Sequence, residues 1–195
     1  MDGLDRTGAL EIVRVSAAAC TRCPLAATRT QVVFGNGRPT ARLMLVGEAP
    51  GADEDHAGAP FVGRAGRALD TILDDAGLAR ADAYVTNTVK CHPPGDRRPT
   101  RNEVDACRPY LDLELSVVRP EVVVALGVTA SRRLVDARAT IAELAGRPVD
   151  VDGITRLATY HPSPASLNRD PERSTRLRAT LVAAGARLSL GAAGP

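Results

Sequence analysis

Residues 43–51 read Leu-Met-Leu-Val-Gly-Glu-Ala-Pro-Gly, an apolar run that passes directly into a turn-forming segment. The apolar run predicts a buried strand, and Gly and Pro favour a tight turn after it. Four carboxylates fall within residues 48–55. A solvated acidic loop is one explanation of this charge, but ligands of open parallel sheets also bind at such strand ends. The segment therefore predicts a strand of a parallel sheet that leads into a candidate ligand loop.

The rest of the chain alternates between apolar runs and segments with helical spacing. Further strands are predicted at residues 83–89, 121–127 and 154–160. Helices are predicted at residues 10–19, 65–76, 101–118, 129–135 and 171–188. This alternation is typical of a parallel α/β sheet covered on both faces. We expect one domain over residues 1–195, a three-layer αβα fold around a central four-stranded parallel sheet, with a loose tail at residues 1–9.

Composition restricts the class of protein. The chain has 195 residues, 44% hydrophobic and 25% charged, and its formal net charge is only +2, so it is no global polycation. Two Phe, three Tyr and no Trp are too few for a surface of stacked aromatics that binds single strands. No apolar run approaches membrane-spanning length, and the first residues lack a signal-peptide core. We therefore expect a cytoplasmic protein that does not contact a membrane.

The chain contains four cysteines, namely Cys20, Cys23, Cys91 and Cys107. In a reducing cytosol, cysteines suggest metal ligation before disulfides. The first two form a C-x2-C pair, which lets two thiolates reach one metal centre from a single turn. Four thiolates suit either tetrahedral zinc or an iron–sulfur cluster, and the spacing does not choose between them. A role as ordinary core thiols is the alternative for the second pair.

Polar residues follow three of the predicted strands, namely Glu48, Asn87 and His161. Because parallel strands end at the same edge of a sheet, we expect their loops to form one cleft, together with Phe61. An aromatic ring stacks on a flat heterocycle, an amide reads its edge, and a neutral His donates to a carbonyl. A local turn role is the simpler alternative for Asn87. The combination indicates a site for a flat, polar heterocycle.

Short motifs occur in a fixed order along the chain. They are Cys-Thr-Arg-Cys-Pro at 20–24, Gly-Glu-Ala-Pro-Gly at 47–51, Pro-Phe-Val-Gly at 60–63, Val-Thr-Asn-Thr-Val-Lys-Cys at 85–91, Ala-Cys-Arg-Pro-Tyr at 106–110, Ala-Leu-Gly at 125–127 and Tyr-His-Pro-Ser at 160–163. Each motif alone is weak, but the ordered set resembles the family 4 uracil-DNA glycosylases, the iron–sulfur type of bacteria and archaea. The resemblance covers roughly residues 20–185.

The resemblance implies a DNA repair enzyme that hydrolyses the N-glycosidic bond of deoxyuridine in DNA, releasing uracil and leaving an abasic site. In this family pattern His161 would donate to uracil O2, and Glu48 would orient or activate water, or stabilise the oxocarbenium-like sugar. Phe61 would stack on the base, and Asn87 would read its Watson–Crick edge. The further residues that the resemblance assigns to the uracil-binding loop are Ala49, Gly51 and Glu54.

The same resemblance implies a structural [4Fe–4S] cluster on the four cysteines, in preference to zinc. The target base would be flipped out of the DNA, which is single- or double-stranded. Residues expected to contact the DNA backbone are Arg97, Arg98, Ser163 and Arg169, and Leu167 is a candidate wedge. We expect a monomer, with a sliding clamp or other repair proteins as candidate accessory partners.

Two other classes of protein compete with this interpretation. The first is a non-catalytic iron–sulfur module that binds DNA within a larger repair or replication assembly. The second is a nucleotide hydrolase on the same sheet, but no G-x4-G-K-[ST] phosphate loop occurs in the chain. Residues interpreted as solvated surface positions are Asp53, His56, His92, Arg173, Arg176 and Arg178.

Overall fold

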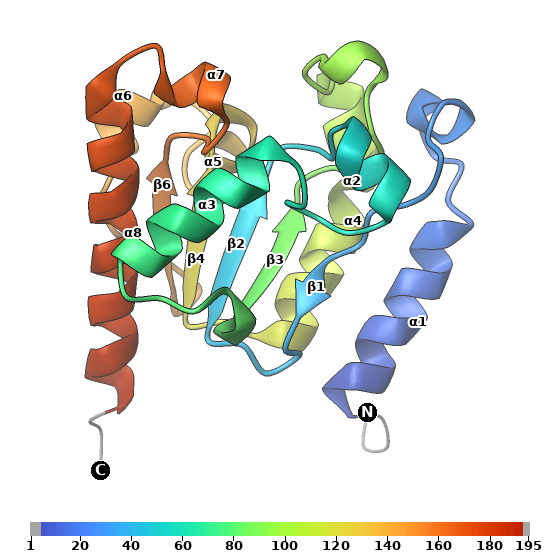
Figure 1. Cartoon of the computed structure of the whole chain (residues 1–195). Coiled ribbons are helices and arrows are strands. Elements are labelled where there is room, and N and C mark those ends of the chain that lie inside the picture. The colour runs from blue at the N-terminus through green and yellow to red at the C-terminus, as the bar shows by residue number, and fades with distance from the viewer. Residues whose placement is uncertain (1–4, 193–195) are drawn as a thin grey trace.

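The computed structural model describes residues 5–192, with side chains to residue 189. The described residues form one six-stranded sheet with helices on both faces (Figure 1). The strand order is β1-β3-β2-β4-β6-β5. The strands are β1 (Asn36–Gly37), β2 (Leu43–Gly47), β3 (Ala83–Asn87), β4 (Val122–Leu126), β5 (Val149–Val151) and β6 (Ile154–Thr159).

The helices of the described residues separate most of these strands. They are α1 (Arg6–Ala18), α2 (Ala52–Ala57), α3 (Arg64–Asp75), α4 (Arg101–Val118), α5 (Val128–Leu134), α6 (Ile141–Leu144), α7 (Pro164–Leu167) and α8 (Pro171–Ala192). Short 3-10 turns lie at η1 (Pro24–Ala27), η2 (Arg80–Asp82) and η3 (Pro94–Asp96). No helix within residues 5–192 is long and apolar enough to cross a membrane.

The centre of the sheet confirms the predicted parallel arrangement. Strand β2 pairs in parallel with β3 and β4, and β4 pairs in parallel with β6. Every residue of β2, β3 and β4 is buried, as expected for strands covered on both faces. Helical crossovers connect these strands, so their carboxyl ends lie at one edge of the sheet.

The sheet as a whole differs from the prediction, because it is mixed and has two additional strands. Strand β1 pairs antiparallel with β3, and β5 pairs antiparallel with β6. Both are short edge strands without a buried apolar run, so hydrophobic pattern alone does not identify them. The turn between β5 and β6 is Asp152-Gly153, and both residues have positive φ, 55° and 75°. Asp-Gly is the signal of a two-residue hairpin, and it could have revealed β5.

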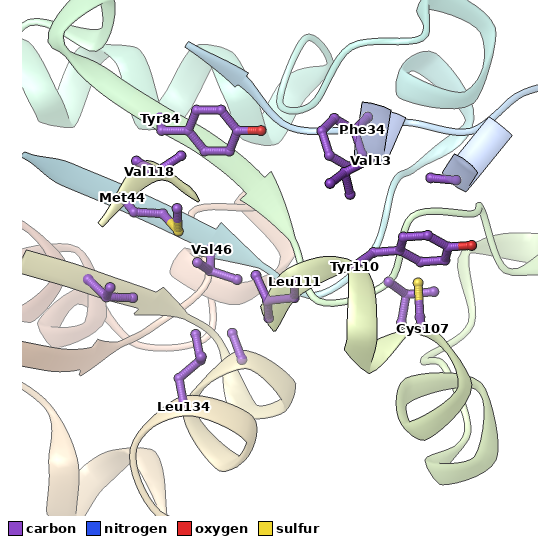
Figure 2. Packing of buried hydrophobic residues seen from close by; sticks show 14 of the residues in the cluster. Val13, Phe34, Met44, Val46, Tyr84, Cys107, Tyr110, Leu111, Val118 and Leu134 are labelled. Carbon is purple, nitrogen blue, oxygen red and sulfur yellow. The ribbon is translucent and has the colours of Figure 1, made fainter. Parts of the chain in front are cut away.

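Successive residues of β2 point to opposite faces of the sheet and separate the core into two layers. Met44 and Val46 pack in the layer beneath α1, α4 and α5, which includes Leu111 and is shown in Figure 2. Leu43 and Leu45 pack in the opposite layer, beneath α3 and α8. This alternation is the period of two expected for a strand, and it places α3 and α8 over one face of the sheet.

The predicted N-terminal tail is wrong for residues 6–9. Helix α1 begins at Arg6, and the side chain of Asp5 accepts a hydrogen bond of 2.8 Å from the backbone N–H of Gly8. Asp is a preferred N-cap residue, so this start is physically ordinary. Residues 1–4, the rest of the predicted tail, lie outside the described residues. By contrast, the predicted capping box of α4 is confirmed, with reciprocal hydrogen bonds between Thr100 and Glu103.

Candidate active site

The candidate site lies at the carboxyl edge of the parallel strands. Glu48 follows β2, Asn87 is the last residue of β3, and His161 lies two residues after the end of β6. Phe61 joins them from the loop between α2 and α3, and its ring centroid lies 6.0 Å from that of His161. The structure therefore brings these four predicted site residues to the same edge of the sheet.

Gly47, the last residue of β2, forms the floor on which two of these side chains lie. A Cβ atom added to Gly47 would lie 2.3 Å from Oδ1 of Asn87 and 2.5 Å from Cζ of Phe61. Both distances are shorter than van der Waals contact, so only glycine permits this packing. The absence of a side chain at this position is what lets the amide and the aromatic ring approach the same strand end.

Phe61 is held in an unusual backbone conformation. Its φ angle is 56°, in the left-handed region that bulky residues rarely adopt. A Cβ at Gly66 would lie 1.8 Å from the carbonyl oxygen of Phe61, so α3 packs directly on this backbone. The next two residues, Val62 and Gly63, donate backbone hydrogen bonds to Glu54. The ring is therefore fixed by its own backbone and not by side-chain packing alone.

Glu54 supports this loop. Its Oε1 accepts from the N–H groups of Val62 at 2.9 Å and Gly63 at 2.7 Å, and its Oε2 accepts from that of Gly51 at 3.1 Å. The carboxylate, predicted to belong to the base-contacting loop, thus ties the Gly-Glu-Ala-Pro-Gly turn to the Phe61 loop. Part of the predicted acidic loop is the short helix α2, and Gly51 is its N-cap. Ala49 is half-buried and packs against the core layer beneath α1, α4 and α5, called the α1–α4 layer below.

Asn87 presents an unused amide at the strand end. The residue is 2% exposed, and its side chain makes no hydrogen bond to any other described residue. Its backbone carbonyl accepts a hydrogen bond of 2.7 Å from Nζ of Lys90. The amide is not among the fully buried side-chain polar atoms that lack a hydrogen-bond partner, so it stays accessible beside Phe61 and is free to bind a ligand.

Lys90 is the only lysine in the sequence, and it is fully buried. Besides the Asn87 carbonyl, its ammonium group donates to Oγ1 of Thr86 at 2.7 Å and to Oε2 of Glu114 at 2.5 Å. Glu114 also accepts from the Tyr84 hydroxyl and from the backbone N–H of Gly35. Because all three ammonium hydrogens are used, this network fixes the end of β3 beneath the candidate site.

His161 has a defined tautomer. Its Nδ1 accepts a hydrogen bond of 3.2 Å from the backbone N–H of Ser163, so in the neutral ring the proton lies on Nε2. Burial lowers the pKa of His161 to about 4, and the negative charge of Glu54 opposes that shift only in part. The ring is therefore neutral near pH 7 and offers one N–H donor.

Glu48 is half-buried, and its carboxylate is held by a residue that sequence analysis missed. Oγ1 of Thr129, in the first turn of α5, donates to Oε2 of Glu48. The backbone carbonyl of Glu48 accepts from the N–H of Val89 at 3.0 Å. Thr129 follows the Ala-Leu-Gly motif by two residues, but a threonine at a helix start carries no sequence signal for contact with a carboxylate 81 positions away.

The predicted DNA-contacting residues fall into two groups. Arg98 and Arg169 are exposed, and within residues 5–189 their side chains form no ion pair. Arg97 instead forms a bidentate pair with Glu103, at 2.9 and 2.7 Å, which together with Thr100 lowers the pKa of Glu103 to about 2. Ser163 caps α7, and Leu167, the predicted wedge, packs partly against the α3–α8 layer.

Two of the predicted surface positions are corrected by the structure. The Arg173 guanidinium is half-buried, lies 5.1 Å from the centroid of the Tyr160 ring, and donates to the carbonyl of Ser166 at 3.3 Å. Stacking on an aromatic ring beside the His161 loop explains its burial. His92 is 16% exposed and lies 2.8 Å from the carboxylate of Asp96. Those found exposed, as predicted, are Asp53, His56, Arg176 and Arg178.

The four cysteines, Cys20, Cys23, Cys91 and Cys107, are unpaired and line one small cavity beside the α1–α4 layer. Two of the sulfurs accept hydrogen bonds, Cys91 from the Arg29 guanidinium at 3.3 Å and Cys107 from the backbone N–H of Lys90 at 3.2 Å. Burial raises the pKa of Cys107 to about 11 and also raises that of Cys91. The core-thiol alternative for the second pair is disfavoured, because both share the cavity of the C-x2-C pair.

The donor set suits either a metal ion or an iron–sulfur cluster. Within the described residues, no group of three or more His, Cys, Asp or Glu side chains is arranged to hold one metal ion. Four thiols nevertheless face the same cavity. An iron–sulfur cluster takes its thiolates at different irons, so they surround the group without converging on a point. Hydrogen bonds to the sulfurs and the nearby Arg29 charge favour thiolate ligands.

The fold and this site define the class of protein. The family model of the uracil DNA glycosylase superfamily matches residues 34–183, and the chain belongs to this superfamily. Within it, the chain is similar to the type-4 uracil-DNA glycosylase of Thermotoga maritima, at 43% identity over 165 residues that cover 84% of this chain and 86% of the relative.

Two archaeal relatives are also similar to the chain. The type-4 uracil-DNA glycosylase of Pyrobaculum aerophilum is 41% identical, over 74% of this chain and 78% of the relative. That of Archaeoglobus fulgidus is 42% identical, over 74% of this chain and 77% of the relative. The predicted family resemblance is thereby confirmed over most of the chain.

Proposed function

We propose that this chain is a type-4 uracil-DNA glycosylase, which hydrolyses the N-glycosidic bond of deoxyuridine in DNA and leaves an abasic site. The observation that carries the proposal is the meeting of Phe61, Asn87, His161 and Glu48 at the carboxyl edge of the sheet, in a member of this superfamily. The reaction makes the chain a monofunctional glycosidase of base excision repair.

Base recognition follows from the two side chains that lie on Gly47. The Phe61 ring would stack on the face of uracil, and the Asn87 amide would pair with its Watson–Crick edge. An amide donates to uracil O4 and accepts from N3–H. Cytosine presents an amino group and an unprotonated N3 at these positions. In the same orientation, the Asn87 NH2 donor would face the cytosine amino donor, and the Asn87 oxygen would face the N3 acceptor. The accessible Asn87 amide, which pairs with no other described residue, supports this role.

His161 and Glu48 would act on the two ends of the breaking bond. As the C1′–N1 bond breaks, its electron pair moves onto the uracil ring, and Nε2–H of neutral His161 donates to the charge on O2. A positioned donor of this kind is worth about 3–4 kcal/mol of barrier. Water attacks C1′, and the Glu48 carboxylate orients it and accepts its proton. The lowered pKa of His161 supports its role as a neutral donor.

The rim of the cleft would bind the DNA backbone. The flipped nucleotide costs unstacking energy, which phosphate contacts help to offset. Exposed and unpaired, Arg98 and Arg169 are suited to phosphates, whereas Arg97 would have to share its charge with Glu103. Ser163 offers its hydroxyl beside His161, and Leu167 is the candidate wedge if it leaves its partial packing. Uracil-containing single- and double-stranded DNA are both proposed substrates.

The four cysteines would hold a [4Fe–4S] cluster, in preference to zinc. When bound, the cluster would supply structural cross-links among the N-terminal turn, the segment after β3 and helix α4. Iron analysis of anaerobically purified protein tests this assignment, and about four irons per chain with a brown absorption are expected. Stoichiometric zinc without iron would instead support a zinc site on the same four cysteines.

We also propose that the protein acts as a monomer in the cytoplasm, where a sliding clamp or other repair proteins could recruit it. The competing role, a non-catalytic DNA-binding module, gives no reason for a neutral histidine donor, an unpaired amide and a held carboxylate around one cleft. Similarity to several type-4 enzymes over most of the chain also favours the enzyme.

The decisive experiment measures base release. Cluster-loaded protein is incubated with a labelled oligonucleotide that carries one uracil, and abasic sites are then cleaved with hot alkali. We expect cutting at uracil, none in a matched thymine oligonucleotide, and a loss of about 10²–10³-fold in His161→Ala. No cutting by brown, iron-loaded protein that still binds DNA would refute the enzyme and support the binding module.

A further inference from the structure

Thr129 approaches the candidate catalytic carboxylate from a different part of the chain. Its hydroxyl donates to Oε2 of Glu48, and it is the only side chain among residues 5–189 found to donate to that carboxylate. We infer that Thr129 is a positioning residue, which holds Oε2 of Glu48 so that Oε1 points its free lone pairs at the attacking water. The inference rests on the proposed function, in which Glu48 acts on water.

The surroundings of Thr129 make it a rigid support. Gly127 is the N-cap of helix α5, and its φ of 98° turns the chain sharply at the end of β4. The N–H of Gly127 donates to the carbonyl of Thr159 at 2.9 Å, and its carbonyl accepts from the Ser131 hydroxyl at 2.8 Å. The start of α5 is therefore tied to the end of β6, one residue before Tyr160.

The same turn also fixes the other candidate catalytic residue. A Cβ at Gly127 would lie 3.2 Å from Cβ of His161, so the turn and the histidine are in close contact. Thr129 lies two residues along this turn, and it reaches Glu48 on the neighbouring strand end. A single rigid element thus sets the separation between the group that acts on water and the group that acts on the leaving base.

A hydrogen bond from a hydroxyl constrains a carboxylate in two ways. It restricts rotation about the last side-chain bond, and it occupies one lone pair of Oε2, leaving Oε1 free for water. Misplacement of a catalytic group by about 1 Å can cost about a hundredfold in rate. Valine has nearly the shape of threonine but no hydroxyl, so Thr129→Val isolates this hydrogen bond from packing.

The test is single-turnover uracil release, measured with affinity for the same DNA. We expect Thr129→Val to lower the release rate about 10- to 100-fold with little change in DNA affinity, and Thr129→Ser to restore most of the rate. Thr180→Val is the matched control, since this buried hydroxyl donates only to a carbonyl within α8 and lies outside the cleft. Its rate should equal that of the wild type.

Repeating the Thr129→Val substitution in the Glu48→Ala variant distinguishes a positioning role of Thr129 from a packing role. In Glu48→Ala, the hydroxyl has no carboxylate to hold, so adding Thr129→Val should change the residual rate less than twofold. A full-size loss in that background, or a Thr129→Val rate equal to wild type, overturns the inference. If Thr129→Val does not fold, Thr129→Ala serves instead, because alanine also lacks the hydroxyl and favours the helix.

The outcomes also distinguish this inference from the proposed function. If the wild-type protein releases no uracil, the proposed function fails, and the inference falls with it. If the wild type and Thr129→Val release uracil equally fast while Glu48→Ala is inactive, the function stands and only the role of Thr129 is refuted.

Discussion

The floor of the candidate site and its rim are built differently. On the floor, Gly47, Phe61 and Asn87 are buried and fixed by backbone geometry, close packing and hydrogen bonds to neighbouring backbone. On the rim, Arg98 and Arg169 are exposed and form no ion pair within the described side chains. The difference indicates that base recognition is preorganised, whereas contact with the DNA backbone remains adaptable. Substitutions should therefore cost far more on the floor than on the rim.

The largest effect is expected from Gly47→Ala. The new Cβ would lie 2.3 Å from Oδ1 of Asn87 and 2.5 Å from Phe61, so both side chains must move. We expect uracil release to fall about 10²–10³-fold while the affinity for thymine-containing DNA changes little. Gly185→Ala in α8 is the control, since its Cβ would meet only the Leu78 side chain at 3.3 Å. Equal activity of both variants would contradict a preorganised floor.

A smaller effect, but a change in kind, is expected from Asn87→Asp. A carboxylate accepts hydrogen bonds but cannot donate to uracil O4, so uracil release should fall about a hundredfold. Discrimination against cytosine should weaken in the same variant, because the donor that repels the cytosine amino group is gone. The measurement compares release from uracil- and cytosine-containing oligonucleotides, with the exposed Asn102→Asp as control. Unchanged discrimination would show that Asn87 does not read the base.

Acid should lower the stability of the folded protein through protonation of His161. Its folded-state pKa is about 4, below the ordinary value of 6.5, so the unfolded chain binds the proton first as pH falls. This contribution to stability is complete above pH 6.5 and is lost as pH falls towards 4, by up to about 3 kcal/mol. Urea unfolding at pH 7 and pH 4.5 measures it. His161→Asn should lose less stability over that interval, and an equal loss would argue that another group titrates.

The smallest effects are expected on the rim. Arg98→Ala and Arg169→Ala should each weaken DNA binding severalfold, equally for uracil and thymine oligonucleotides, and should lower the salt slope of log K by about one. Arg97→Ala should instead lower the melting temperature, because it leaves the buried Glu103 carboxylate without its bidentate partner. Binding titrations at several salt concentrations separate the two behaviours. If an Arg98 or Arg169 variant lost affinity for uracil oligonucleotides only, the proposed difference between floor and rim would be wrong.

The sequence predicts the centre of this molecule better than its edges. The buried runs of β2, β3, β4 and β6 carry their own signal, and the parallel order then brings Glu48, Asn87 and His161 to one edge. Strands β1 and β5 are defined by pairing with a neighbour, and two or three residues carry too little hydrophobic pattern to predict them, although the Asp152-Gly153 turn signals the β5–β6 hairpin. The mixed sheet follows from these edges.

The same limit applies to the site. Residues that would touch the base lie in motifs and could be predicted, as could the support of their loop by Glu54, but the more distant supports could not. Thr129 is 81 residues from the carboxylate it holds, and Arg173 packs on Tyr160 from the start of the last helix. Such roles depend on which surfaces the fold brings together, and local residue patterns do not record this.

The burial of Lys90 has a consequence for the fate of the product. Glycosylases that also nick DNA use an amine to form a Schiff base with the sugar aldehyde, after which the strand breaks by β-elimination. Lys90 is the only lysine in the sequence, and its amine is fully buried and hydrogen-bonded to Thr86, Asn87 and Glu114. No lysine can therefore reach the aldehyde, and borohydride should trap no lysine-linked adduct.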